Sequence, residues 1–277
     1  MKIPKKYHNY DPAPTIPVPG FSDDCFVGEA EIAAALQKRI SGRGRTVLTV
    51  DCYPGVRYTD VLQLFSALEP ASCFCSDDCA LSKAAYAEEI ADFLTEDPVF
   101  GVMCPWTIDR FFDSDRLSAM RKKIAEADGV ILVYGVGASL LCRGDIRVYA
   151  DLSRWEIQLR YRGGSPNWNS DNAAARPTEK FKQGYFIEWR FADRHKQDIW
   201  QDTEYFLDTH RADCPKLVTA SALFAGLEAA ASRPFRLVPY FDPGVWGGHW
   251  MQEVFDLDPA APNYAWSFDG VPEENSL

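Results

Sequence analysis

The stretch Thr46-Val-Leu-Thr-Val-Asp51 decides the fold class of this chain. Its β-branched and apolar residues are typical of a β-strand. Residues 28–40, which precede it, carry apolar side chains at helical spacing and end at the turn sequence Ser41-Gly-Arg-Gly44. A helix followed by a strand is the beginning expected of an α/β domain.

The alternation of helix-like and strand-like patterns continues after residue 51. Helical spacing predicts helices at about residues 57–68, 82–94, 115–127 and 153–161. Strand-like runs lie between them, at about residues 99–104, 129–134 and 146–150. The run Gly129-Val-Ile-Leu-Val-Tyr134 is short, apolar and bounded by glycine, which suits a strand buried on both faces. We therefore expect βαβ units around a parallel sheet.

The patterns beyond residue 162 complete the predicted domain. Residues 163–172 have the composition of a loop, Tyr185–Phe191 alternates like a strand, and Asp202–Leu207 is a further short element. Leu217–Ala231 is rich in alanine and predicts a helix, which ends at Ser232-Arg-Pro234. We predict three parts: an extended proline-rich arm at 1–20, an α/β domain at 21–232 and a short β-rich segment at 233–277.

The composition limits the class of partner. With 47% hydrophobic residues, the 277-residue chain has enough apolar side chains for a packed core. Its 40 acidic and 29 basic residues give a net charge of −11, which repels the phosphate backbone of nucleic acids. The longest nearly apolar run, residues 129–142, is too short and too rich in glycine to span a bilayer. We expect a cytoplasmic protein with neither a nucleic-acid nor a membrane partner.

The eight cysteines are spread along the chain, mostly beside hydrophobic residues, which indicates buried reduced thiols rather than a disulfide framework. One cluster stands out, namely Cys73, Cys75 and Cys79. Three thiols this close together are candidates for a zinc site, but no fourth ligand lies nearby and the spacing differs from that of zinc fingers.

The turn after the first strand, Asp51-Cys-Tyr-Pro-Gly-Val-Arg-Tyr58, lies where a P-loop would bind phosphate. Asp51 and Val56 stand at the two glycine positions of that motif, Arg57 at the lysine position and Tyr58 at the hydroxyl position. A carboxylate at Asp51 would face phosphate oxygens, and Pro54 has no N–H to donate. These features predict a domain that has lost phosphoryl transfer.

Residues 21–232 nevertheless resemble the uridine kinase-like branch of P-loop phosphotransferases. The resemblance rests on Asp145-Ile-Arg-Val-Tyr-Ala-Asp151 with the arginines that follow it, and on Phe186-Ile-Glu-Trp-Arg-Phe-Ala-Asp193. It implies a nucleotide or a phosphorylated sugar as a ligand. Arginine suits phosphate because its guanidinium group binds two oxygens at once. The candidates are Arg57, Arg147, Arg154 and Arg160. Alternatively, these arginines are surface residues paired with carboxylates of this acidic protein.

The segment Pro239-Tyr-Phe-Asp-Pro-Gly-Val-Trp-Gly-Gly248, followed by Tyr264-Ala-Trp-Ser-Phe268, resembles the opening of class I mannose-6-phosphate isomerases, which are metal-dependent cupin-fold enzymes. The resemblance implies that the chain is the N-terminal portion of such a protein and is inactive alone. Trp246 and Trp250 are candidates for stacking against a sugar, or else for packing in a core. A missing cupin domain in the same chain, or a second copy of the protein, is expected to cover this segment.

The histidines do not make a metal site. His8, His195 and His210 lie among polar or charged neighbours and are expected to be solvated, while His249 follows the Trp-Gly-Gly turn without a second histidine after it. The resemblance carries no catalytic residue and no metal ligand over to this chain, so zinc is expected only if a complete cupin domain follows. The alternative function is a nucleotide- or phosphosugar-binding P-loop-like domain, either a phosphotransferase or a regulatory module.

Overall fold

The strand β2 (Arg45–Cys52) is the middle one of the five parallel strands in a seven-stranded sheet. The computed structural model describes residues 15–232, 235–239 and 268–272, and the chain divides into two units, residues 23–220 and residues 1–22 with 221–277. In β2 every residue from Thr46 to Cys52 is buried, as expected for a strand covered on both faces. The sequence therefore predicted this strand correctly.

The sheet of the first unit has the spatial order β1-β7-β6-β5-β2-β4-β3. The pairs that join β3, β4, β2, β5 and β6 are parallel, whereas β7 is antiparallel to β6 and β1 is antiparallel to β7. The strands beside β2 are β1 (Cys25–Val27), β3 (Ser72–Cys75), β4 (Gly129–Gly135), β5 (Ile146–Asp151), β6 (Tyr205–Asp208) and β7 (Lys216–Thr219). The predicted α/β class with a largely parallel sheet is confirmed.

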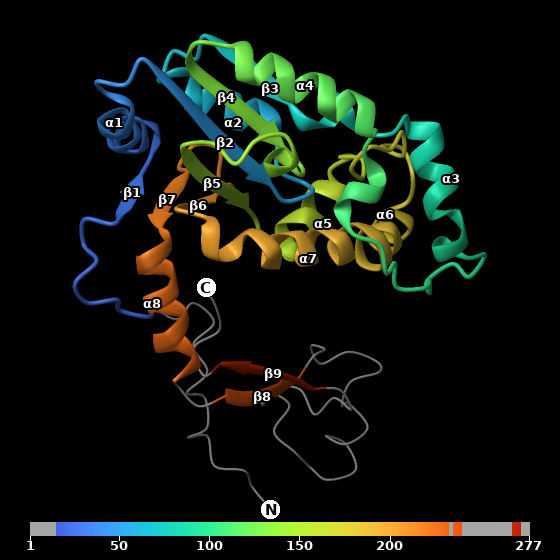
Figure 1. The fold of residues 1–277 in the computed structure, drawn as a ribbon. Coiled ribbons are helices and arrows are strands. Elements are labelled where there is room, and N and C mark those ends of the chain that lie inside the picture. The colour runs from blue at the N-terminus through green and yellow to red at the C-terminus, as the bar shows by residue number, and fades with distance from the viewer. Residues whose placement is uncertain (1–14, 233–234, 240–267, 273–277) are drawn as a thin grey trace, which may run out of the picture. The chain divides into compact units, whose positions relative to one another are not determined.

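Helices lie on both faces of this sheet (Figure 1). They are α1 (Glu29–Ile40), α2 (Tyr58–Ser66), α3 (Lys83–Leu94), α4 (Ser114–Glu126), α5 (Arg154–Arg162), α6 (Pro177–Gln183) and α7 (Trp189–Ile199). Short helical turns are η2 (Ser76–Cys79), η3 (Ile108–Phe111), η4 (Ala138–Leu140), η5 (Gly184–Glu188) and η6 (Trp200–Asp202). The helices predicted at 28–40, 57–68, 82–94, 115–127 and 153–161 are all present, each within two residues of its predicted ends.

The strand order of the sheet reverses its direction at β2, because β3 and β4 lie on one side of β2 and β5 and β6 on the other. β4 lies on one side of β2 and β5 on the other, so the connection from β4 to β5 starts beside the carboxyl end of β2 and runs back along this strand. In open parallel sheets, ligands bind beyond the carboxyl ends of the strands where the strand order reverses. Asp51 and the loops beside it therefore lie where a ligand site is expected in this fold.

The predicted strand at Tyr185–Phe191 is wrong, because these residues form η5, a π-helical turn, and the start of α7. Residues 186–189 are all buried, so the local alternation of bulky and polar residues does not correspond to two faces of a sheet. Packing on every side decides the conformation here, and it overrides the strand preference of aromatic and β-branched residues.

The strand predicted at 99–104 is absent, and the segment is a loop. Phe100 is 68% exposed and Val102 is 53% exposed. The backbone of Val102 donates to Phe93 and that of Cys104 donates to Phe186, so the segment bonds to helical elements instead of a neighbouring strand.

Three strands of the seven-stranded sheet were not predicted, namely β1, β3 and β7. They are only three or four residues long and lie toward the edges of the sheet, so they carry too little periodic pattern to be recognised. The helix predicted at Leu217–Ala231 begins at Ala220 as α8 (Ala220–Ala231), because the residues before it belong to β7.

In the second unit, β8 (Phe235–Pro239) pairs antiparallel with β9 (Phe268–Pro272), and Phe235 lies opposite Pro272. The arm predicted at 1–20 falls mostly outside the described residues, as do Trp246 and Trp250. Among the helices of the described residues, none has the length and apolar character needed to cross a membrane.

Candidate functional site

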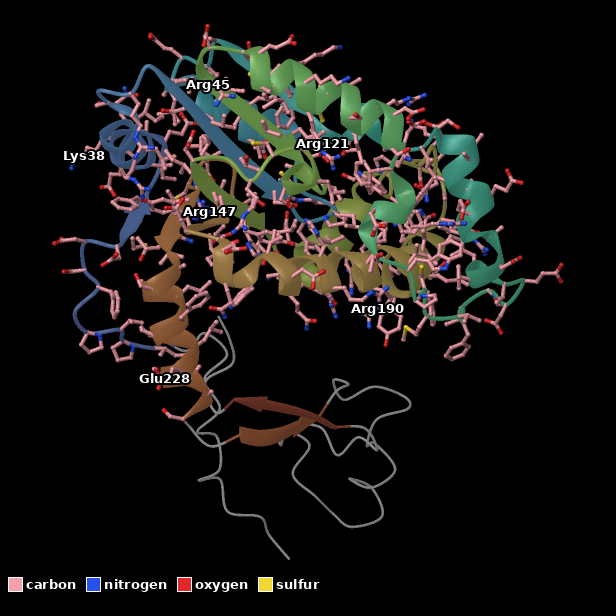
Figure 2. The ribbon with its side chains drawn as sticks, in the orientation of Figure 1. Lys38, Arg45, Arg121, Arg147, Arg190 and Glu228 are labelled. Carbon is pink, nitrogen blue, oxygen red and sulfur yellow. The ribbon has the colours of Figure 1, made fainter. Side chains whose placement is uncertain are left out.

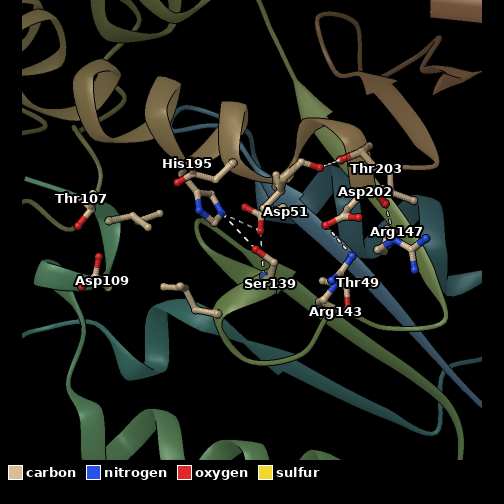
Figure 3. Close-up of a pocket in the computed structure, with 15 residues that line it drawn as sticks. Thr49, Asp51, Thr107, Asp109, Ser139, Arg143, Arg147, His195, Asp202 and Thr203 are labelled. Carbon is tan, nitrogen blue, oxygen red and sulfur yellow. Dashed lines mark hydrogen bonds and ion pairs between the residues drawn. The ribbon is translucent and has the colours of Figure 1, made fainter. Parts of the chain in front are cut away.

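Asp51 is the penultimate residue of β2, and its side chain is almost completely buried, with 3% of the residue exposed. Its Oδ1 accepts a hydrogen bond from the backbone N–H of Gly137 at 3.1 Å. Its Oδ2 accepts one from the backbone N–H of Ser139 at 2.8 Å and lies 3.1 Å from Nε2 of His195 (Figure 3). Asp51 therefore joins β2, the loop after β4 and helix α7.

The loop after β4 presents its backbone N–H groups to this carboxylate because Gly137 has a left-handed conformation, with φ of 71°. A Cβ atom there would lie 3.0 Å from the side chain of Ile108. Successive N–H groups in such a turn form a concave site for anions. Here the chain's own Asp51 occupies that site, so these two donors are engaged before any external anion arrives.

His195 is buried and lies over Asp51. Burial by itself lowers the pKa of His195, but the attraction to the Asp51 carboxylate and the hydrogen bond between them outweigh burial, and the pKa is raised above its usual value. When His195 is protonated, it therefore forms a buried ion pair with Asp51.

Ser139 Oγ lies 3.2 Å from Nε2 of His195, the same ring nitrogen that contacts Asp51. A Ser-His-Asp triad needs the two imidazole nitrogens for different partners, since one holds the aspartate and the other takes the proton of the serine. A single nitrogen cannot perform both tasks at once. The three residues therefore do not form a nucleophile of the serine hydrolase type.

The turn after β2 is closed. The N–H of Val56 donates to the carbonyl of Tyr53 at 3.1 Å, Pro54 lies between them, and Gly55 has φ of 104°. Proline followed by glycine with positive φ is typical of a type II turn. The turn is tight, and Pro54 has no N–H, so few donors remain to wrap a phosphate. This agrees with the sequence-based argument against a P-loop.

A cavity of about 340 Å³ opens beside Asp51. Figure 3 shows its lining, which comes from β2, β5, α7 and the loops around η3, η4 and η6. The residues at its buried end are polar and include Thr49, Asp51 and His195, whereas Asp109, Arg143, Asp198 and Asp202 lie at its exposed rim. This volume lies within the range of pockets that bind small molecules.

The four candidate arginines have separate roles. Arg57 is an exposed residue just before α2, and Arg147 lines the cavity while its Nε donates to the carbonyl of Asp202 (Figure 2 labels Arg147). Arg154 pairs with Asp193. Arg160 is buried and donates to the carbonyls of Gly55 and Thr209, at 2.8 and 2.7 Å. Arg160 thus holds the turn after β2. The alternative of surface arginines paired with carboxylates fits Arg147, which pairs with Glu204, and Arg154, whereas Arg160 pairs with Glu156 but is buried.

The cysteine cluster does not converge. All eight cysteines are free, with Cys73 exposed, Cys75 partly exposed and Cys79 buried. Within the described ranges of the chain, no group of three His, Cys, Asp or Glu side chains is arranged to hold a metal ion. The expected burial of the thiols holds for Cys52, Cys79 and Cys104, whereas the other five cysteines are exposed or partly exposed.

The expectation that His195 is solvated is wrong, and the residue was missed as part of a site. A pattern for it exists, because Glu188, Phe191, Ala192 and Ile199 lie three, four or seven residues from it, as on one face of a helix. His210, by contrast, is exposed as predicted and contacts Asp208. Ser139 carries no comparable pattern.

A second buried group lies at the π-helical turn. Glu188 is completely buried, and it accepts hydrogen bonds from Tyr161 at 2.9 Å and from Gln183 at 3.1 Å. Burial raises the pKa of Glu188 to about 7, although the hydrogen bonds partly oppose the shift. Each carboxylate oxygen of Glu188 thus has a hydrogen-bond donor, and the group links the π-helical turn to α5 and α6.

The sequence of the α/β unit matches a protein-family model. The model is described as a domain of unknown function, DUF8485, and it matches residues 28–232. The chain belongs to the DUF8485 family. The DUF8485 match includes every strand of the seven-stranded sheet except β1, and it includes Asp51, Ser139 and His195. No curated protein matches the sequence.

Proposed function

We propose that this DUF8485 protein is the N-terminal portion of a mannose-6-phosphate isomerase-like protein. The observation that carries the proposal is the Trp-Gly-Gly sequence at 246–248 within Pro239–Gly248. The strand pair of β8 and β9 supports it, because these antiparallel strands flank the sequence motif. Two strands alone are marginally stable, so they are expected to belong to a larger β-structure such as a cupin domain.

The reaction of the resembled family interconverts mannose 6-phosphate and fructose 6-phosphate. A metal ion polarises the carbonyl group there, and a base moves the proton between neighbouring carbons. The resemblance carries no metal ligand over to residues 1–277, so the proposal assigns no catalytic residue to this chain.

The α/β unit is proposed to be a degenerate P-loop kinase-like domain that binds a ligand without transferring phosphate. Its strand order, with β2 central, supports the likeness to such domains. The side chain of Asp51 and the closed turn at Pro54 oppose phosphoryl transfer, since they remove donors and add negative charge where phosphates would lie.

A coupled assay for the conversion of mannose 6-phosphate to fructose 6-phosphate, with zinc added, tests the isomerase proposal. A protein in which a cupin domain follows residue 277 is expected to be active, whereas residues 1–277 alone are expected to be inactive. Activity of residues 1–277 alone, or no activity of the protein with the cupin domain, would contradict the proposal.

Calorimetry with ATP and magnesium tests the alternative, a nucleotide-binding phosphotransferase. We expect no heat of binding at millimolar ATP. Binding at micromolar strength would show that Asp51 and Pro54 do not block the site, and it would favour the phosphotransferase.

A further inference from the structure

We propose that the cavity beside Asp51 binds a neutral, hydroxyl-rich small molecule of monosaccharide size. The inference goes beyond the proposed isomerase function, since it concerns the α/β unit alone and no step of the isomerisation. It rests on three properties of the cavity: the polar groups at its buried end, the charges at its rim and its apolar walls.

The buried end offers acceptors to hydroxyl groups. Asp51 Oδ1 accepts one hydrogen bond, from Gly137, and a carboxylate oxygen has room for two. Thr49 donates its hydroxyl hydrogen to the carbonyl of Cys142 at 2.9 Å, which leaves its oxygen able to accept. Ser139 Oγ, beside His195, can rotate to donate or accept. Several convergent acceptors and one hydroxyl suit a ligand that carries several hydroxyl groups.

The rim opposes a phosphate. Carboxylates among the lining residues outnumber the cations, because four aspartates face two arginines and one histidine. Both arginines are engaged already, Arg143 with Asp202 and Arg147 with Glu204 and the carbonyl of Asp202. A phosphate dianion would have to displace these partners and approach unfavourable charges. A neutral ligand meets neither obstacle.

Apolar side chains form the remaining walls. Ile108, Leu140, Val148 and Ile199 line the cavity together with the polar groups. Pockets for small molecules commonly combine a largely apolar lining with a few placed polar groups. A sugar ring has C–H faces for such walls and hydroxyl groups for Asp51, Thr49 and Ser139. A volume of about 340 Å³ is sufficient for one such ring.

Thermal melting and calorimetry of the 277-residue protein test the inference with four probes: mannose, fructose, fructose 6-phosphate and inorganic phosphate. At a sugar concentration ten times Kd, mannose or fructose should raise Tm by about 3 °C or more. The phosphate ester should bind more weakly than fructose at low ionic strength, and inorganic phosphate should cause no shift.

Two variants locate the site. Ser139→Ala removes one hydroxyl and keeps the backbone N–H to Asp51, so it should weaken sugar binding about 2- to 10-fold. Leu140→Trp fills the cavity and should abolish binding. Thr59→Ala, which removes an exposed hydroxyl on α2, is the matched control and should bind as the wild type does. Circular dichroism checks that each variant is folded. If Leu140→Trp does not fold, the sugar affinity of Ser139→Ala alone tests where the sugar binds.

Three results would overturn the inference. The first is no shift in Tm with either sugar at 100 mM. The second is tighter binding of fructose 6-phosphate than of fructose, which would make the cavity an anion site. The third is wild-type affinity in Ser139→Ala and in folded Leu140→Trp, which would place the sugar elsewhere. None of these results depends on isomerase activity, so they are distinct from a failure of the proposed function.

Discussion

Replacement of Asp51 by asparagine probes the contact that joins β2, α7 and the loop after β4. The asparagine keeps the size of the side chain but removes its charge, and it turns one acceptor into an N–H₂ group. That group would face either the N–H of Gly137 or the donors of Ser139 and His195, which now bond to the carboxylate at 2.8 to 3.1 Å. At least one buried donor therefore loses its partner.

The cost follows from burial. Asp51 and His195 are 3% and 7% exposed, and removing one partner of a buried ion pair typically lowers stability by about 3–5 kcal/mol. A loss of about 1 kcal/mol lowers Tm by roughly 2–4 °C in a domain of this size. Asp51→Asn is therefore expected to melt at least about 6 °C below the wild type.

The dependence on pH separates the ion pair from simple packing. The pKa of His195 is raised in the folded protein, so its favourable contribution is fully present below the pKa of an unfolded histidine, about 6.5, and is lost as pH rises through the folded value. The difference in stability between wild type and Asp51→Asn should be larger at pH 6 than at pH 9.

Urea unfolding followed by circular dichroism at both pH values measures this difference. The control is Asp213→Asn, which breaks an exposed pair with Arg211 and should leave the midpoint unchanged. If Asp51→Asn unfolds within about 1 kcal/mol of the wild type at pH 6, the buried pair does not stabilise the fold as argued. A difference that grows toward pH 9 would show that the sign of the linkage is wrong.

Three further predictions concern the rest of the α/β unit. Because burial raises the pKa of Glu188 to about 7, wild-type stability should fall between pH 5 and pH 8 by about 3 kcal/mol, and urea unfolding of Glu188→Gln should show a much flatter profile. Gly55→Ala should destabilise by more than Gly42→Ala in thermal melts, since both glycines have positive φ but only a Cβ at Gly55 meets a neighbour, the side chain of Ile157 at 3.1 Å; equal losses would contradict the turn packing. Under native conditions a thiol reagent should modify the exposed Cys25 before the buried Cys52. Mass spectrometry of the labelled peptides measures the order, and earlier labelling of Cys52 would contradict the prediction.

Much of the α/β unit follows from the sequence because local pattern and final packing agree there. Residues 46–51 are mostly β-branched or apolar and residues 129–134 are a short apolar run, and both form strands whose central residues are buried. The helices have one apolar face each, and that face packs against the sheet or its neighbours. The missing donor at Pro54 also followed from the sequence, since proline has no backbone N–H whatever its surroundings.

Pattern and packing disagree where a segment is buried on all sides. Residues 185–191 contain bulky residues at nearly every position, so a window of seven residues shows no helical face, and only the longer series through His195 and Ile199 reveals it. Glu188 lies in this buried segment, and burial raises the pKa of its carboxyl group to about 7.

The sequence by itself determined the class of the fold and the buried strand that contains Asp51, and it predicted that the turn after this strand offers few donors to a phosphate. Only the tertiary structure decided what Asp51 does. Its partners Ser139 and His195 lie 88 and 144 residues away along the chain, and no local preference records such a distance. They meet because the parallel strands bring their carboxyl ends to one edge of the sheet and α7 packs across it, so the site is a product of topology.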